Sequence, residues 1–148
     1  MPERDTPTTI LAFDFGLRRI GVAVGQTVTG SASPLGVVSN GVDGPDQARI
    51  AALIEEWRPG RLVVGLPLNA DGTEGALVDT VRTFAGELEA HGLPLDWCNE
   101  HASSREAEQT LKRARQAGSR GRIQKTDIDA AAAVVIAERY LAGLAARP

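Results

Sequence analysis

The chain has 148 residues, of which 43% are hydrophobic, and a formal net charge of −3. This length predicts one domain whose core is large enough to fold without disulfides, and the single cysteine, Cys98, excludes a disulfide within the chain. No apolar run approaches the roughly 18 residues that a membrane span needs, and the acidic N-terminus MPERDTPTT lacks the apolar region of a secretory signal. We therefore expect a cytoplasmic protein without a membrane partner.

The first half of the chain predicts three strands and one helix. Two strands around a tight turn are expected over residues 8–14 and 19–25, and a third strand over 34–39. The helix is expected over 45–57, because its apolar residues recur at helical spacing and a Pro-Gly pair follows. Trp57 is expected in the core, as is Trp97 later in the chain.

The second half alternates between strands and helices. Strands are expected over 61–67 and 94–99, and helices over about 75–90, 103–117 and 127–144. A strand meander followed by such alternation predicts an α/β fold, in which helices cover both faces of a mixed sheet. We expect one domain over residues 1–148, with flexible segments at 1–7 and about 116–125.

Three carboxylates stand at positions where a site could form. Asp14 ends the first predicted strand, Glu100 follows the fifth, and Asp129 lies in the first turn of the last helix. Carboxylates brought together repel one another unless a cation neutralises them, and oxygen ligands suit Mg²⁺ or Mn²⁺. Two such ions, about 4 Å apart, would act on the attacking and leaving oxygens of a phosphodiester. Each acid also has an ordinary structural role open to it, in a turn, a solvated loop or a helix N-terminus.

Four segments of the chain together resemble one protein family. They are AFDFGLRRIGVAVG (12–25), VVGLPLNADGTEG (63–75), NEHASSREAE (99–108) and DIDAAAAVVIAERYL (127–141). In this order they are similar to the motifs of the YqgF/RuvX family, which comprises pre-16S rRNA nucleases and Holliday-junction-resolvase-like proteins of the RNase H-like superfamily. The first two segments are specific, whereas the last is weak by itself.

The resemblance implies a fold and a site. It implies an RNase H-like three-layer fold with a five-stranded mixed sheet of order 3-2-1-4-5, so that Asp14 lies in the middle of the sheet. Asp14, Glu100 and Asp129 match the family's acids, which implies that they bind metal and cleave phosphodiester bonds. Ser103 and Ser104 match hydroxyl positions. Asn99 and His101 depart from the family's usual Asp and Arg, and Asn99 removes a charge that could have supported the metal ligands.

Basic residues indicate where a phosphate backbone would bind. We expect one arginine after the first strand to face the site, and Arg19, which matches the family's Arg-Ile-Gly position, is favoured. Residues 112–125 hold six cations and no acid, which predicts salt-sensitive binding of nucleic acid, although a solvated charged helix is the alternative. The expected nucleic-acid contacts are Arg18, Arg19, Ser103, Ser104, Lys112, Arg113, Arg115, Arg120, Arg122 and Lys125.

The leading hypothesis is a metal-dependent nuclease, a monomer or weak homodimer, that processes the 5′ end of pre-16S rRNA. A Holliday junction resolvase acting on branched DNA is the first alternative. A nucleotide-binding enzyme of the sugar-kinase/actin type is a further alternative, although such enzymes need two domains of this kind. A nucleic-acid-binding module without catalysis is the last, and the departures at Asn99 and His101 favour it.

Overall fold

The computed structural model describes residues 8–67, 75–100 and 125–146. The described elements, in chain order, are β1 (Thr9–Asp14), β2 (Arg19–Gln26), β3 (Ser31–Gly41), β4 (Gly44–Pro45), α1 (Gln47–Trp57), β5 (Arg61–Pro67), α2 (Val78–Glu89), β6 (Leu95–Glu100) and α4 (Lys125–Ala146).

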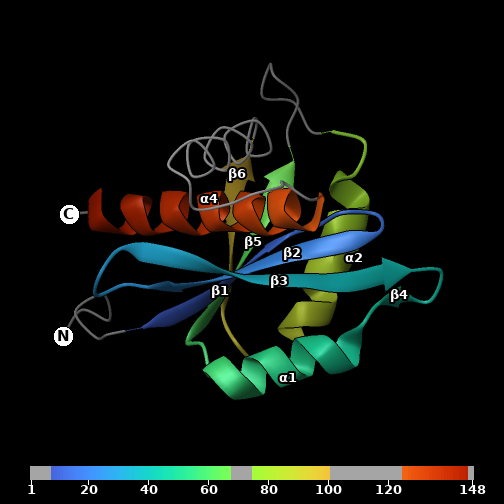
Figure 1. Cartoon of the computed structure of the whole chain (residues 1–148), viewed down its shortest axis with the longest axis horizontal. Coiled ribbons are helices and arrows are strands. Elements are labelled where there is room, and N and C mark those ends of the chain that lie inside the picture. Colours follow the sequence, from blue (N-terminus) through green and yellow to red (C-terminus); the bar gives the residue numbers. More distant parts are fainter. Residues whose placement is uncertain (1–7, 68–74, 101–124, 147–148) are drawn as a thin grey trace.

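One mixed sheet runs through the molecule in the order β4-β3-β2-β1-β5-β6. β1 pairs antiparallel with β2 and parallel with β5, and β5 pairs parallel with β6. The predicted order 3-2-1-4-5 is therefore confirmed, with the two-residue β4 added at one edge. α4 lies on one face of the sheet and α1 on the other, as Figure 1 shows.

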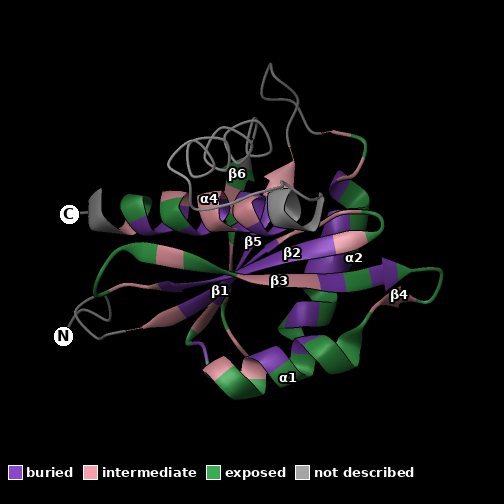
Figure 2. Ribbon diagram, viewed as in Figure 1, coloured by how far each residue is buried: buried purple, intermediate pink, exposed green. Residues whose placement is uncertain are grey.

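The strands alternate between two hydrophobic cores. Leu11 and Phe13 of β1 pack in one core with residues of α1 and α2, whereas Ile10 and Ala12 pack in the other with α4. Successive strand residues point to opposite faces, so a strand buried on both sides reads as a continuous apolar run. Figure 2 shows this burial: the central strands are buried, and the outward side of α1 is exposed.

Small residues let α4 lie close to the sheet. Ala133 and Ala137 of the helix share a core with Ala12 of β1 and Ala23 of β2. A Cβ atom added at Gly25 would lie 3.0 Å from Cδ1 of Leu141, which is tighter than ordinary contact. The alanine-rich run of the last helix thus matches the small residues of β2 beneath it.

Several predicted boundaries differ from the structure. β3 is longer at both ends than the predicted 34–39. Its polar first residues pair with the end of β2, and its last two residues, Asn40 and Gly41, pair with β4. Pro45 pairs with Asn40 in β4, and Asp46 caps α1 by accepting a hydrogen bond from the backbone N of Arg49 at 3.1 Å. Glu100 belongs to β6 instead of following it.

The last helix begins earlier than expected, and one predicted core residue is exposed. Lys125, predicted in a flexible loop, is the first residue of α4. Trp57 packs partly buried against the core, as predicted, but Trp97 is 39% exposed, because β6 is the outer strand of the sheet. Within the described part of the chain, no helix is long and apolar enough to cross a membrane. The predicted helix over 103–117 and the segments 1–7 and 116–124 lie outside the described residues.

Candidate active site at the end of the central strand

Asp14 is the last residue of β1 and is half-buried. It pairs with Gly21 of β2, and it follows Ile10 and Ala12 in the alternating set that faces α4. Because Gly21 has no side chain, the α4 face of the sheet beside Asp14 is not filled by a neighbour on β2. A carboxylate at this position is accessible to a ligand in a way that the buried residues before it are not.

The turn after Asp14 is fixed by Asn40 of β3. The Asn40 side chain, 7% exposed, donates from Nδ2 to the carbonyl oxygen of Gly16 at 2.7 Å, and its backbone N donates to the carbonyl of Arg18 at 2.9 Å. A Cβ atom added at Gly16 would lie 2.4 Å from the carbonyl oxygen of Arg19, so only glycine fits this turn without a shift. The backbone that follows Asp14 is thus fixed by hydrogen bonds to Asn40 and by the close approach of Gly16 to Arg19.

The two arginines of the turn differ in position. Arg18 is exposed, whereas Arg19 is half-buried at the start of β2, where it pairs with Ser39 of β3. Arg19, Gly21 and Ala23 are every second residue of β2 and so lie on one face of the sheet. This is the α4 face, the same face as Asp14. This is the face on which an arginine could contact a phosphate bound near Asp14.

The backbone positions of the other two acids are described, but their side chains lie outside the described residues. Glu100 ends β6, paired with Pro67 at the end of β5, and Asp129 is the fifth residue of α4. Among the residues whose side chains are described, no three potential metal ligands gather. The remaining predicted contacts also lie outside the described residues: Ser103, Ser104, Lys112, Arg113, Arg115, Arg120 and Arg122, together with the side chain of Lys125. His101, the other departure from the family motif, lies outside them as well.

Asn99, which stands where the family usually has Asp, lies near the end of β6. It is exposed. Asp96 and Cys98 lie on the α4 side of β6, and Asn99, which follows Cys98 directly, points to the other side. Asn99 therefore belongs to the opposite face from Asp14. The charge that could have supported the metal ligands is thus lost on the face opposite to Asp14.

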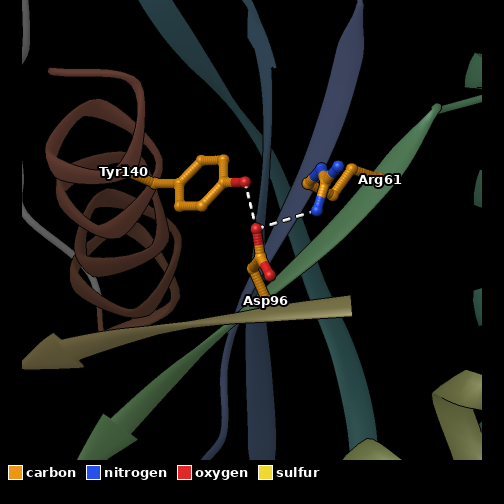
Figure 3. A network of polar contacts seen from close by, with 3 residues as sticks. All are labelled: Arg61, Asp96 and Tyr140. Atoms are coloured by element: carbon orange, nitrogen blue, oxygen red, sulfur yellow. Dashed lines mark hydrogen bonds and ion pairs between the residues drawn. The ribbon is translucent and has the colours of Figure 1, made fainter. Parts of the chain in front are cut away.

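At the opposite end of the same strands, three side chains tie α4 to the sheet. Figure 3 shows Asp96 of β6 between Arg61 of β5 and Tyr140 of α4. Arg61 Nη1 lies 2.9 Å from Asp96 Oδ2, and the Tyr140 hydroxyl donates to the same oxygen. Arg61 and Asp96 stand near the N-terminal ends of their strands, so this network lies away from Asp14 and fixes the C-terminal half of α4.

The comparisons with known proteins agree with this fold. The model of a family described as RuvX, Holliday junction resolvase, matches residues 8–143. The chain belongs to the RuvX family. The resemblance seen in the sequence motifs is therefore confirmed over almost the whole chain.

Relatives of this RuvX-family chain carry the name "Putative pre-16S rRNA nuclease". One from Methylobacillus flagellatus is 45% identical over 145 residues, covering 97% of both chains. Another, from Chromohalobacter salexigens, is 46% identical over 134 residues, covering 90% of this chain and 88% of the relative.

Two solved resolvases share the fold. Thermus thermophilus RuvC, in complex with a Holliday junction substrate, superimposes with a TM-score of 0.55 at 18% identity, covering 93% of this chain and 97% of RuvC. The yeast mitochondrial Holliday junction resolvase Ydc2 gives a TM-score of 0.55 at 12% identity, covering 96% and 82%. At these identities the likeness concerns the fold, and it agrees with the predicted RNase H-like architecture.

Sequence reasoning missed the role of Asn40, which contacts the turn after Asp14 in this RuvX-family chain. The sequence shows only an asparagine before a glycine at the end of a predicted strand. Its role depends on a turn 24 positions earlier in the chain, so no local pattern could reveal it.

Proposed function

We propose that this RuvX-family protein is a divalent-metal-dependent nuclease that hydrolyses phosphodiester bonds, and that its substrate is the precursor of 16S rRNA. The observation that carries the proposal is the position of Asp14. This half-buried carboxylate ends the central strand on the face that α4 covers. Asp129 belongs to that same helix. Glu100 ends β6, which runs in the same direction as β1, so both acids lie at the C-terminal ends of their strands.

The strand register supports a shared site for Asp14 and Glu100. Phe13 is level with Val64, and Gly65 is level with Cys98, so Glu100 stands two residues beyond the level of Asp14 and two strands away. At about 4.8 Å between strands and 3.3 Å per residue, the two backbone positions are about 12 Å apart. Two carboxylate side chains can meet across that separation.

The packing of α4 supports the inclusion of Asp129. Leu141 lies over Gly25, which pairs with Ile10 near the start of β1. With a rise of about 1.5 Å per residue, position 129 is about 18 Å along the helix from Leu141. Asp14 is about 13 Å along β1 from Ile10. The two lengths are similar enough for the first turns of α4 to reach the level of Asp14.

The residues fit the chemistry of Mg²⁺ or Mn²⁺, because carboxylate oxygens are the ligands that these ions prefer. We assign Asp14, Glu100 and Asp129 as the groups that would hold two ions when substrate is bound. Bound there, the ions would supply Lewis acidity for hydrolysis of the phosphodiester. Arg19 would hold a phosphate oxygen of the substrate, and the fixed turn after Asp14 would keep its carboxylate in position.

Replacement of Asp14 by Asn tests the proposal. We expect Asp14→Asn to lose Mg²⁺-dependent cleavage of a labelled pre-16S rRNA fragment by a factor of about 100 or more, because it removes a ligand charge. EDTA should abolish cleavage by the unaltered protein. The unfolding curve of the variant should match that of the parent chain. Asp79→Asn is the control, because the Asp79 side chain is fully exposed at the start of α2. Cleavage by Asp14→Asn at the parent rate would contradict the assignment.

A second candidate function follows from the description of the matching family, which names Holliday junction resolvase. A four-way DNA junction, a single-stranded RNA and a pre-16S rRNA end, each labelled and incubated with Mg²⁺, separate the two. Symmetrical cuts in the junction, with intact RNA, would favour the resolvase.

A further inference from the structure

A cavity of about 250 Å³ is lined by Phe15, the residue after Asp14, on the face of the sheet opposite to the one that α4 covers. It is formed between the β1–β2 turn, the end of β3 and the outer side of α2, and its lining includes Phe15, Leu17, Asn40, Thr80, Thr83 and Glu87. Drug-sized ligand sites occupy roughly 300–1,000 Å³. This smaller cavity suits one flat ring system, not a whole nucleotide.

Asn40 gives the cavity a directed polar group. Asn40 belongs to the lining, and its Nδ2 donates to the carbonyl of Gly16, which leaves the carbonyl oxygen Oδ1 as the side-chain group that can accept a hydrogen bond. No residue in the described part of the chain donates a hydrogen bond to this oxygen, although Asn40 is 7% exposed. An acceptor this buried favours a ligand that brings its own donor.

Phe15 gives the cavity an aromatic surface that is held in place. It is half-buried, and its ring centroid lies 5.3 Å from that of Phe84, which is almost fully buried in α2. Leu17, in the same turn, is 64% exposed and extends the apolar surface at the mouth. Aromatic faces of this kind stack with unpaired bases of single-stranded nucleic acid.

We infer that this cavity binds one unstacked base of the substrate, a base with an exocyclic amino group that stacks on Phe15 and donates to Asn40 Oδ1. The inference rests on the proposed nuclease function and makes it more specific. Asp14 and Phe15 are consecutive, so their Cα atoms are about 3.8 Å apart. The bound base therefore belongs to a nucleotide close to the cleaved phosphodiester. Because that base is unstacked, it is unpaired when it is bound, in a single strand or extruded from a helix.

A cavity-filling variant tests the inference in the whole 148-residue chain. Thr80 is an exposed residue of the lining, and Thr80→Phe would fill the cavity from α2. Gly86→Phe is the matched control, since it adds the same ring to the same helix where nothing lies within 4 Å of an added Cβ atom. The probe is a short single-stranded RNA with one 2-aminopurine, titrated in EDTA so that no cleavage takes place. We expect Thr80→Phe to weaken binding about tenfold, in the range of one lost base stack, and Gly86→Phe to leave it within twofold.

A second measurement uses the unaltered protein and so does not depend on how a variant folds. An RNA with purine riboside, which lacks the amino group, replaces one with adenosine at the position of strongest 2-aminopurine response. We expect the change to weaken binding about fivefold, the effect of one lost buried hydrogen bond. The same change should have no effect on the Thr80→Phe variant.

The outcomes separate this inference from the proposed function. Equal RNA binding by Thr80→Phe and Gly86→Phe, with equal affinity for purine riboside and adenosine, overturns the base site while Mg²⁺-dependent cleavage still supports the nuclease. Discrimination in both binding measurements without cleavage supports the base site and overturns the nuclease. Absence of both binding and cleavage overturns the two together.

Discussion

At the scale of single residues, the turn after Asp14 shows how one carboxylate is positioned. Gly16 approaches the backbone of Arg19 too closely for any side chain, and Asn40 of β3 donates a hydrogen bond to the carbonyl of Gly16. The isolated acid within an apolar sequence is explained by its place at the end of the strand, where its charge is only partly removed from water.

Replacement of Gly16 by Ala should destabilise the fold by about 1–3 kcal/mol, because the new methyl group overlaps the Arg19 carbonyl and forces the turn to move. Urea unfolding of the parent and variant measures the difference. Gly41→Ala is the control: an added Cβ atom there meets nothing within 4 Å, so the expected change is below about 0.5 kcal/mol. Equal urea midpoints for Gly16→Ala and the parent would contradict the prediction, because they would show that the turn moves to accept the methyl group at no cost in stability.

At the scale of elements, α4 is fixed to the sheet by two different means. Small residues allow close contact with β1 and β2, and the Arg61–Asp96–Tyr140 network holds the C-terminal half of the helix at the N-terminal ends of β5 and β6. If Asp129 acts in the site, this distant network fixes the helix that carries it.

Tyr140→Phe should lower the free energy of unfolding by about 1 kcal/mol, since it removes one hydrogen bond to a partly exposed carboxylate. Thermal and urea unfolding would measure the loss. Glu55→Gln, which breaks an ion pair with Arg58 whose side chains are 76% and 83% exposed, serves as the comparison and should change stability by less than about 0.5 kcal/mol. A larger effect for Glu55→Gln than for Tyr140→Phe would contradict this ranking.

At the scale of the whole molecule, a protein of net charge −3 is proposed to bind a polyanion. Long-range attraction by the whole chain cannot assist this binding, so local cations must supply it. The sequence concentrates them in residues 112–125, ahead of Asp129.

Arg120→Ala combined with Arg122→Ala should therefore weaken RNA binding and reduce the slope of log K against log salt by about 1.4, because each phosphate contact on a single strand contributes about 0.7. Titrations at several salt concentrations measure the slope. Arg49→Ala together with Arg58→Ala, two exposed cations at the ends of α1, is the matched control and should leave it unchanged. An unchanged slope for the first pair would favour the alternative of a solvated charged segment.

The sequence by itself determined the described elements other than β4, and their order, because apolar periodicity, prolines and glycines act over a few neighbouring residues. The family motifs, not periodicity, supplied the strand order and the identity of the three acids. Tertiary structure decided which face each residue occupies: it exposed Trp97 on an outer strand, turned Asn99 away from Asp14 and brought Asn40 to the turn after Asp14. These outcomes depend on hydrogen bonds and packing between segments far apart in the chain. A pattern of neighbouring residues does not specify which distant segments they will contact.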